Sequence, residues 1–281
     1  MRMSRTIVGG LLACTLLIAA PVAAMSAEPP VPAPGASERV DAIRQRGTLR
    51  VAVLDEYPWL KKNPTGASAS FEGPAWLLAE DYARRLGVKL ETTPVGFDDK
   101  VSILSSSRVD ITIVPLLETP ARAEAVDLVT YSQAAHCLFG RADNPKVAQA
   151  SSIGDLNRPD VTIGFINDTP QGAWVKDRLP RAARHGVPGT IADLATSEVV
   201  SGEADVAPVD QFFFAGLSRK VPGLETIPKG ATCLSSTELS IPIGMAISKG
   251  QPVFLDWLRA EAREIQPQLE AEQTRVVAEG P

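Results

Sequence analysis

Short apolar runs alternate with helical patterns along most of this chain, and this alternation constrains the fold more than any other feature. Apolar strands are predicted at residues 48–54, 88–92 and 109–114. The clearest helix, residues 75–86, carries one apolar stripe opposite a charged side, and Gly87 ends it. Strands that alternate with helices predict an α/β domain with a largely parallel sheet.

The same pattern starts again in the second half of the chain. A strand is predicted at residues 161–166, a helix begins at Pro170, and another helix is predicted near 192–200. A late strand at 241–247 precedes a terminal helix, which Pro267 should break or kink. Two similar α/β units in series, with a last segment that returns, predict two lobes around a cleft.

The N-terminus has the layout of a secretory signal peptide, which we predict at residues 1–27. A basic start is followed by an apolar run at 7–20, too short to span a membrane with margin, and then by small residues that suit cleavage. Lipidation at Cys14 is disfavoured because this cysteine lies inside the apolar run. The Pro-rich segment 28–37 is predicted to be an extended tether. No later stretch is apolar enough to cross a membrane, so a secreted protein is expected.

Charge and cysteine content limit the partners of the mature chain. Cleavage removes two arginines and no acid, so the formal net charge changes from -5 to -7, which disfavours nucleic acid and anionic lipids. Cys137 and Cys233 remain, and in an oxidising compartment such a pair tends to form a disulfide. His136 could join them at a metal, but three scattered ligands without a motif disfavour a metal site, and no cofactor is expected.

Arg122 follows the strand at 109–114 and is the strongest candidate for a ligand contact. A threonine and a proline just before it predict a helix start, so Arg122 lies in the first turn, where a cation opposes the helix dipole. A planar, permanently charged guanidinium beside a strand end suits bidentate capture of a carboxylate. The alternative is a solvated arginine paired with Glu118 or Glu124.

The order of several short motifs resembles the family 3 periplasmic solute-binding proteins. Each motif is weak alone, but together they cover nearly all of the mature chain. The resemblance implies a two-lobed periplasmic binding protein type II fold, with crossover strands near 134–138 and 238–244 as the hinge. Lobe one would hold residues 38–134 and 245–281, and lobe two residues 135–244. The motifs are Gly47-Thr48-Leu49-Arg50-Val51-Ala52-Val53, Phe71-Glu72-Gly73, Ala83-Arg84-Arg85-Leu86-Gly87-Val88, Val109-Asp110-Ile111, Thr119-Pro120-Ala121-Arg122, Tyr131-Ser132 and Gly202-Glu203-Ala204-Asp205.

Three residues take on roles by their motif positions in this resemblance. Arg122 resembles the residue that grips a ligand α-carboxylate from lobe one. Thr169, at a helix start in lobe two, resembles its partner, with a hydroxyl and free backbone N–H groups. Asp210 resembles the acid that receives the α-ammonium. Thr169 and Asp210 could instead be plain helix caps.

The loop after the first strand completes the predicted ligand-binding set. Tyr57 and Trp59 match positions where aromatic side chains of the family wall the ligand, and Asp55 lies in the same loop, which is rich in groups that could meet a ligand. Either aromatic residue could instead belong to the core, Trp59 more so.

The resemblance implies a monomeric periplasmic protein that closes on a small carboxylate-bearing molecule, often an amino acid, and delivers it to the permease of an ABC transporter. No catalytic residue is expected. Two departures from the family pattern leave the ligand open: Val114-Pro115-Leu116-Leu117 lacks a supporting hydroxyl, and Pro74-Ala75-Trp76 replaces an acid. Leu116, Leu117 and Trp76 suggest a more apolar pocket than arginine or glutamate binders have.

An enzymatic alternative comes from the cyclohexadienyl dehydratases, which share this fold. They resemble the chain at Cys137, at residues 156–161 and at Glu238, before the late strand. In such an enzyme, a carboxylic acid of raised pKa could help a hydroxyl group leave the substrate. Here, however, Asp168, in the turn just before Thr169, should repel a dicarboxylate such as prephenate. A third possibility is a binding module that signals to, or assists, another periplasmic protein.

Overall fold

The computed structural model describes residues 29–63, 71–188, 192–230, 233 and 236–280. The predicted signal peptide lies outside these residues. The part of the predicted tether that is described, residues 29–37, forms neither helix nor strand. Val31 nevertheless packs against the core, and the Pro32 carbonyl accepts a hydrogen bond from Arg44 at 3.0 Å. None of the helices in the described ranges is both long and apolar enough to span a bilayer.

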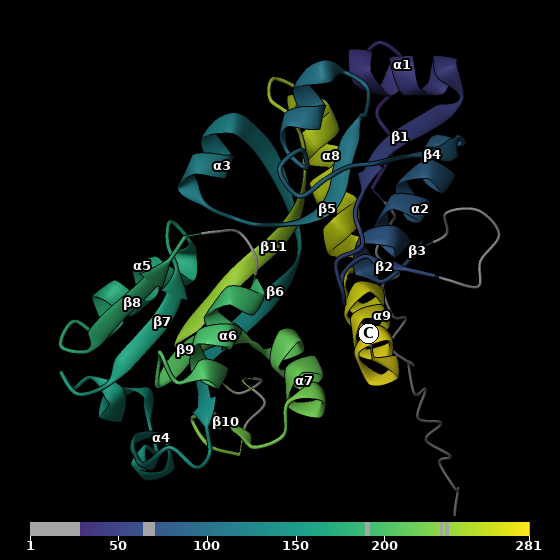
Figure 1. Ribbon diagram of the computed structural model, residues 1–281. Helices are drawn as coiled ribbons and strands as arrows, with labels where there is room; N and C mark the ends of the chain where they lie inside the picture. The colour runs from purple at the N-terminus through teal and green to yellow at the C-terminus, as the bar shows by residue number, and fades with distance from the viewer. Residues whose placement is uncertain (1–28, 64–70, 189–191, 231–232, 234–235, 281) are drawn as a thin grey trace, which may run out of the picture.

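Figure 1 shows the secondary structure along the chain. The helices are α1 (Glu38–Arg46), α2 (Pro74–Leu86), η1 (Ser102–Ser106), α3 (Pro120–Ala125), α4 (Pro145–Gln149), η2 (Ile153–Leu156), α5 (Pro170–Arg178), α6 (Ala192–Ser201), α7 (Gln211–Lys220), α8 (Pro252–Glu264) and α9 (Gln266–Glu279). The strands are β1 (Thr48–Val53), β2 (Lys61–Lys62), β3 (Phe71–Glu72), β4 (Lys89–Pro94), β5 (Ile111–Leu117), β6 (Val126–Arg141), β7 (Thr162–Ile166), β8 (Ala183–Val187), β9 (Val206–Asp210), β10 (Leu224–Ile227) and β11 (Leu239–Ser248).

One sheet runs through both lobes in the order β4-β1-β5-β11-β6-β9-β7-β8, and β10 pairs with β6. In lobe one, β1 is parallel to β4 and β5; in lobe two, β7 is parallel to β8 and β9. Between them, β6 and β11 are antiparallel to each other and run from one lobe to the other (Figure 1). The predicted two-lobed α/β fold is therefore present. Its sheet is largely parallel within each lobe and antiparallel where the chain crosses, and β10 is also antiparallel to β6.

The crossover strands are longer than the sequence suggested. The predicted crossover segments are only the middle of β6 and the first part of β11, which pair from His136 opposite Leu239 to Val126 opposite Ser248, with a register shift between Ile243 and Gly244. The predicted lobe boundaries, after Ala134 and before Met245, fall inside these two strands. The boundaries themselves stay a prediction.

The core of lobe one lies between the sheet and helices α2, α8 and α9. The apolar stripe of α2 is buried, and the Tyr82 hydroxyl donates to the Leu258 carbonyl of α8 at 2.8 Å. The terminal helix is interrupted as predicted: α8 ends at Glu264, α9 begins at Gln266, and Pro267 lies in the first turn of α9. The resulting bend lets α9 contact α2, which places it beside the loop that follows β1.

Lobe two contains two smaller cores, one on each side of β6. The first packs β7 against α5, and the second packs β9 against α7. In the second core the predicted disulfide joins Cys137 of β6 to Cys233, and both residues are fully buried. The disulfide ties the segment before β11 to the crossover strand.

Candidate functional site

Three charged side chains gather at the carboxyl ends of the parallel strands of lobe one. Glu56 follows β1, Lys100 follows β4 and Arg122 follows β5. The Lys100 Nζ lies 3.2 Å from the Glu56 Oε1, and the Arg122 Nη1 donates to the Leu117 carbonyl at 2.7 Å. We call Glu56, Lys100 and Arg122 the lobe-one charge cluster. Crevices outside the carboxyl ends of strands are the usual ligand sites of open α/β sheets.

Arg122 is held by the helix start that the sequence predicts. The Thr119 hydroxyl accepts a hydrogen bond from the Arg122 backbone N–H at 3.2 Å, and Pro120 occupies the first turn of α3. The alternative partners are not used in the described part of the chain: Glu118 accepts from the Thr130 hydroxyl, and no ion pair joins Arg122 to Glu118 or Glu124. The half-buried guanidinium therefore has a carbonyl partner but no carboxylate in contact.

Burial shifts the pKa of every member of the lobe-one charge cluster towards the neutral form. It raises the pKa of Glu56, although the charges of Lys100 and Arg122 oppose this shift. It lowers the pKa of Lys100, which Glu56 counteracts, and it lowers the pKa of Arg122, which Glu56 also counteracts. Two cations share one carboxylate in a place that water solvates poorly, so an arriving anion would be stabilised there.

A buried phenol faces the same cluster. Tyr131 of β6 is 2% exposed, and its hydroxyl has no hydrogen-bond partner among the residues that the structure describes. Burial raises the pKa of Tyr131 well above its ordinary value, and the nearby charge of Glu56 adds to the shift. A buried hydroxyl without a partner is destabilising, so the fold retains this group at a cost beside the cluster.

In lobe two, the predicted acid Asp210 lies at the end of β9 opposite His136 of β6. Its Oδ1 accepts from the backbone N–H groups of Phe212 and Phe213 at 2.9 and 2.8 Å, so the capping role proposed for Asp210 is present. Within the described ranges its Oδ2 has no hydrogen bond, which leaves one carboxylate oxygen for another donor.

His136 and α5 complete the lobe-two group. The His136 Nδ1 lies 3.0 Å from the Ala134 carbonyl, and its Nε2 lies 3.0 Å from the Gln171 side-chain nitrogen. Burial lowers the pKa of His136, while the negative charge of Asp210 opposes this shift. A neutral ring that donates from Nδ1 and accepts at Nε2 satisfies both contacts.

Thr169 caps α5, close to Gln171. Its hydroxyl accepts from the Gly172 N–H at 3.1 Å and donates to the Ile166 carbonyl at 2.8 Å. Asp168, just before it, adopts the left-handed conformation with φ 59°. The Thr169 hydroxyl therefore acts as a helix cap, as the alternative interpretation predicted. Because Pro170 has no N–H and the Gly172 N–H is bonded to Thr169, a ligand contact in this turn falls to the Gln171 backbone N–H.

Trp59 links the two lobes. Its ring lies edge-on to Phe212 of α7, with 5.3 Å between the centroids, and its Nε1 donates to the Ser132 hydroxyl at 3.1 Å. The same ring packs against the lobe-one core, so the core interpretation of Trp59 is present, whereas its contact with a ligand stays a prediction. Because Phe212 is two residues after Asp210, this contact brings the loop after β1 next to the lobe-two group.

Asp55 and Tyr57 lie in the predicted loop, but no contact joins them to Arg122 within the described ranges. The exposed Asp55 accepts from the Lys62 N–H at 2.9 Å, and the Tyr57 hydroxyl donates to the Val277 carbonyl of α9 at 3.3 Å. Glu56, between them, is the residue that joins the cluster. Neighbouring side chains of an extended segment point to opposite faces, so alternation separates Glu56 from Asp55 and Tyr57 but does not tell which face meets the cluster.

Of the residues that suggested an apolar pocket, Leu116 belongs to the core instead. Leu116 is fully buried, because β5 continues through it to Leu117 and its side chain joins the core. Trp76 packs on Phe71, with 5.7 Å between the ring centroids. The prediction is wrong for Leu116, because β5 is longer than its apolar pattern indicated, and for the half-buried Trp76 of α2 it stays a prediction.

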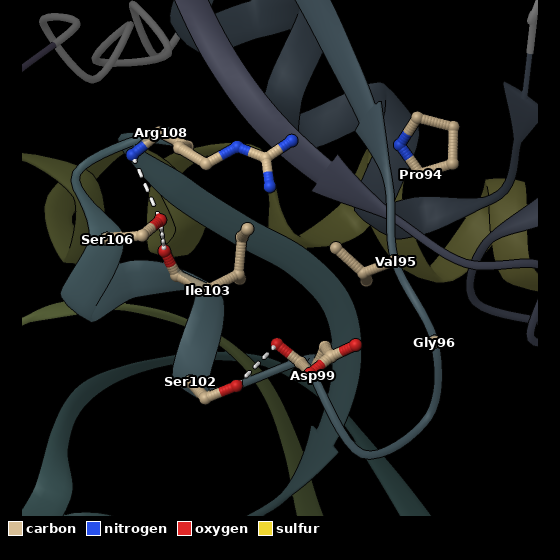
Figure 2. A pocket seen from close by; sticks show the side chains of 8 residues that line it. All are labelled: Pro94, Val95, Gly96, Asp99, Ser102, Ile103, Ser106 and Arg108. Carbon is tan, nitrogen blue, oxygen red and sulfur yellow. Dashed lines mark hydrogen bonds between the residues drawn. The ribbon is translucent and has the colours of Figure 1, made fainter.

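Two cavities are lined by residues other than the members of the lobe-one charge cluster. Figure 2 shows the first, about 430 Å³, between the end of β4 and η1. Its Ser102 and Ser106 hydroxyls bond to nearby carbonyls, of Asp99 and Ile103. The second, about 470 Å³, lies between β6 and α9 and is lined by Thr130, Tyr131, Ser132, Gln133, Gln266, Glu270 and Gln273. Neither contains Arg122 or Asp210.

Glu238, the acid of the dehydratase interpretation, is paired with a cation. Its two carboxylate oxygens accept from Arg178 of α5 at 2.7 and 3.0 Å. These hydrogen bonds, together with the charge of Arg178, lower the pKa of Glu238. A general acid needs the opposite shift, so the geometry favours an ionised, structural Glu238.

The family model for bacterial extracellular solute-binding proteins, family 3, matches residues 49–274. Among curated protein sequences, none matches this chain.

Many solved structures share the fold. The ancestral amino-acid-binding protein AncCDT-1, described as a precursor of cyclohexadienyl dehydratase, is 27% identical with a TM-score of 0.61, covering 85% of this chain and 97% of its own. The arginine-bound, truncated ArgBP of T. maritima is 25% identical with a TM-score of 0.58, covering 80% of this chain and 99% of its own. The arginine-bound AbpA of Streptococcus pneumoniae, at 19% identity and a TM-score of 0.62, covers 85% of this chain and 98% of its own and shows the fold alone.

Proposed function

The chain belongs to the bacterial extracellular solute-binding proteins of family 3, and from this membership we propose that it captures an amino acid between its lobes. We further propose that it does so in the periplasm and delivers the ligand to the permease of an ABC transporter. The solute-binding role comes with the family. The ligand class and the delivery step are our proposals.

Arg122 carries the proposal for the ligand class. Its guanidinium is half-buried, and in the described part of the chain its hydrogen-bond acceptor is the Leu117 carbonyl rather than a carboxylate. It belongs to a cluster with two cations and one acid. A ligand carboxylate would neutralise the excess charge and accept charge-assisted hydrogen bonds, each worth roughly 1.5 to 3 kcal/mol.

Lobe two supplies complementary groups for the rest of a zwitterion. The Asp210 Oδ2 is available for an ammonium, and the Gln171 backbone N–H in the first turn of α5 is available for the carboxylate. Trp59 already contacts Phe212 across the lobes. Because lobe-two groups reach the ligand only when the lobes approach, binding would favour the closed arrangement.

The named relatives support an amino-acid ligand. AncCDT-1 is described as an ancestral cationic amino acid solute-binding protein, and the T. maritima protein was solved with arginine. At 27% and 25% identity these relatives support the chemical class and leave the side chain open.

We propose binding rather than dehydration as the function. AncCDT-1 is also described as a precursor of a dehydratase, but here Arg178 holds Glu238 in its ionised form. Incubating the protein with prephenate or arogenate and following the aromatic product tests this choice, and we expect no product above the uncatalysed rate.

A thermal-shift screen against the standard amino acids, followed by calorimetry on the best ligand, tests the main proposal. A ligand that binds only the folded state raises the melting temperature. We expect Arg122→Met to weaken binding about 30-fold or more while the protein stays folded. Arg108→Met removes an exposed arginine of the same lobe and serves as the matched control. Wild-type affinity in Arg122→Met, or no shift with any amino acid, would overturn the proposal.

A further inference from the structure

Lys100 is buried in a way that lysines rarely are. It is 7% exposed, and its Nζ lies 3.2 Å from the Glu56 Oε1 and 3.9 Å from the centroid of the Phe97 ring. Lysine side chains are seldom buried unless they are paired, and burial removes much of the rotamer freedom of a long side chain. This buried lysine lies beside the predicted ligand site. The charge of Arg122 is close enough to affect the pKa of both Lys100 and Glu56.

The two partners of the Lys100 ammonium form a cation site. A carboxylate together with an aromatic face is the combination that recognises ammonium and guanidinium groups in ligands. Here Glu56 comes from the loop after β1, and Phe97 comes from the segment between β4 and η1. Both elements belong to the carboxyl edge of the sheet, the edge on which Arg122 lies. A ligand whose carboxylate binds Arg122 would therefore reach this site with its side chain.

We propose that Lys100 acts as a specificity-determining residue by filling the cation site formed by Glu56 and Phe97 with the chain's own ammonium group. The protein then rejects amino acids with cationic side chains and accepts those with uncharged or acidic ones. This inference rests on the proposed amino-acid binding. A ligand carboxylate brings the lobe-one charge cluster to neutrality, whereas an arginine or lysine side chain would face Lys100 as a like charge and would find Glu56 already occupied.

Replacement of Lys100 tests the inference directly. Calorimetry with L-arginine compares wild type, Lys100→Met and the double variant Lys100→Met/Glu56→Gln. We expect Lys100→Met to bind arginine at least about tenfold more tightly than wild type, and the double variant to lose that gain because the vacated acceptor is gone. Lys100→Gln repeats the test with a polar side chain in case methionine disturbs folding, and circular dichroism checks each variant.

Lys89→Met, an exposed lysine of β4, is the matched control and should leave arginine binding unchanged. Equal affinity for arginine in wild type and in both Lys100 variants would overturn the inference. A gain that survives Glu56→Gln would also overturn it. The same series measures the binding of neutral and acidic amino acids by wild type. If wild type binds one of them, a failed arginine test contradicts only the role of Lys100 and leaves the proposed amino-acid binding in place. Absence of binding for every amino acid in every variant contradicts the proposed function as well.

Discussion

Two clusters of basic and acidic side chains lie at opposite ends of the same parallel strands of lobe one. The lobe-one charge cluster lies beyond the carboxyl ends of β1, β4 and β5. The second, which we call the Asp110 cluster, lies at the amino ends, where Asp110 directly precedes β5. Its members are Arg39, Arg46, Arg50 and Asp110.

The two clusters differ in whether their charged groups contact a group of opposite charge. The Asp110 side chain is fully buried, and its two oxygens accept hydrogen bonds from all three arginines and from the Arg50 backbone N–H. Cations outnumber the acid in both clusters, but all three arginines of the Asp110 cluster contact its carboxylate, whereas Arg122 has no carboxylate in contact within the described residues. A saturated acid needs no further partner, whereas a poorly solvated cation without a counterion favours an anion from outside. The first arrangement therefore stabilises the fold, and the second suits a ligand.

Asp110→Asn should give the largest loss of stability. Replacing the buried carboxylate removes the counterion of three neighbouring guanidinium groups and turns one acceptor oxygen into an NH2 donor, and breaking a buried ion pair typically costs about 3 to 5 kcal/mol. We expect about 3 kcal/mol, at the lower end, because the three arginine side chains are 23% to 31% exposed. Urea unfolding measures the loss, and calorimetry should show unchanged ligand affinity. A loss of affinity without a loss of stability would reverse the roles that we assign to the two clusters.

Arg122→Lys should produce the opposite pattern. Lysine keeps the positive charge but lacks the planar fork that binds a carboxylate through two hydrogen bonds. We expect ligand affinity to fall about tenfold, or roughly 1.4 kcal/mol, with no loss of stability in urea, because no ion pair of the described structure is broken. Unchanged affinity in this variant would mean that Arg122 acts only as a point charge.

The elements that position Arg122 could be predicted from the sequence. The strand before Arg122, the helix start at Thr119 and the two-lobed α/β order all follow from local patterns, and the structure confirms them. Periodicity and capping depend on neighbours within a few residues, which the sequence shows directly.

The members of each cluster could not be predicted in the same way. Glu56 and Lys100 are 44 residues apart, and only the pairing of β1 with β4 brings them together. Asp110 and Arg50 meet through the pairing of β1 with β5. The choice of Asp55 and Tyr57 over Glu56 depended on which face of the loop points to the cluster, and the sequence leaves that open. Long-range register decides all of these contacts.

The raised pKa of Glu56 predicts a pH dependence for the lobe-one charge cluster. Burial raises the pKa of Glu56 in the folded state above that of the unfolded chain, about 4.3. The folded state therefore holds this proton more strongly, and the associated stability is present at low pH and lost as pH rises through the folded-state pKa. Glu56→Gln cannot ionise, so urea unfolding from pH 4 to 7 should show it gaining stability relative to wild type as pH rises. The exposed Glu203→Gln should show no such trend, and a constant difference for Glu56→Gln would contradict the prediction.

An exposed ion pair of the same sheet should give the smallest effect. The Lys249 Nζ lies 3.1 Å from Asp127, and the lysine side chain is 46% exposed. Water already solvates both charges, so Lys249→Met should change the free energy of unfolding by less than about 0.5 kcal/mol and leave ligand affinity unchanged. Urea unfolding beside Asp110→Asn checks this. A loss comparable to that of Asp110→Asn would show that ion pairing itself, rather than burial of the acid, explains the structural role of the Asp110 cluster. The different roles of the lobe-one charge cluster and the Asp110 cluster would then follow from the geometry of their ion pairs and not from the burial of their charges.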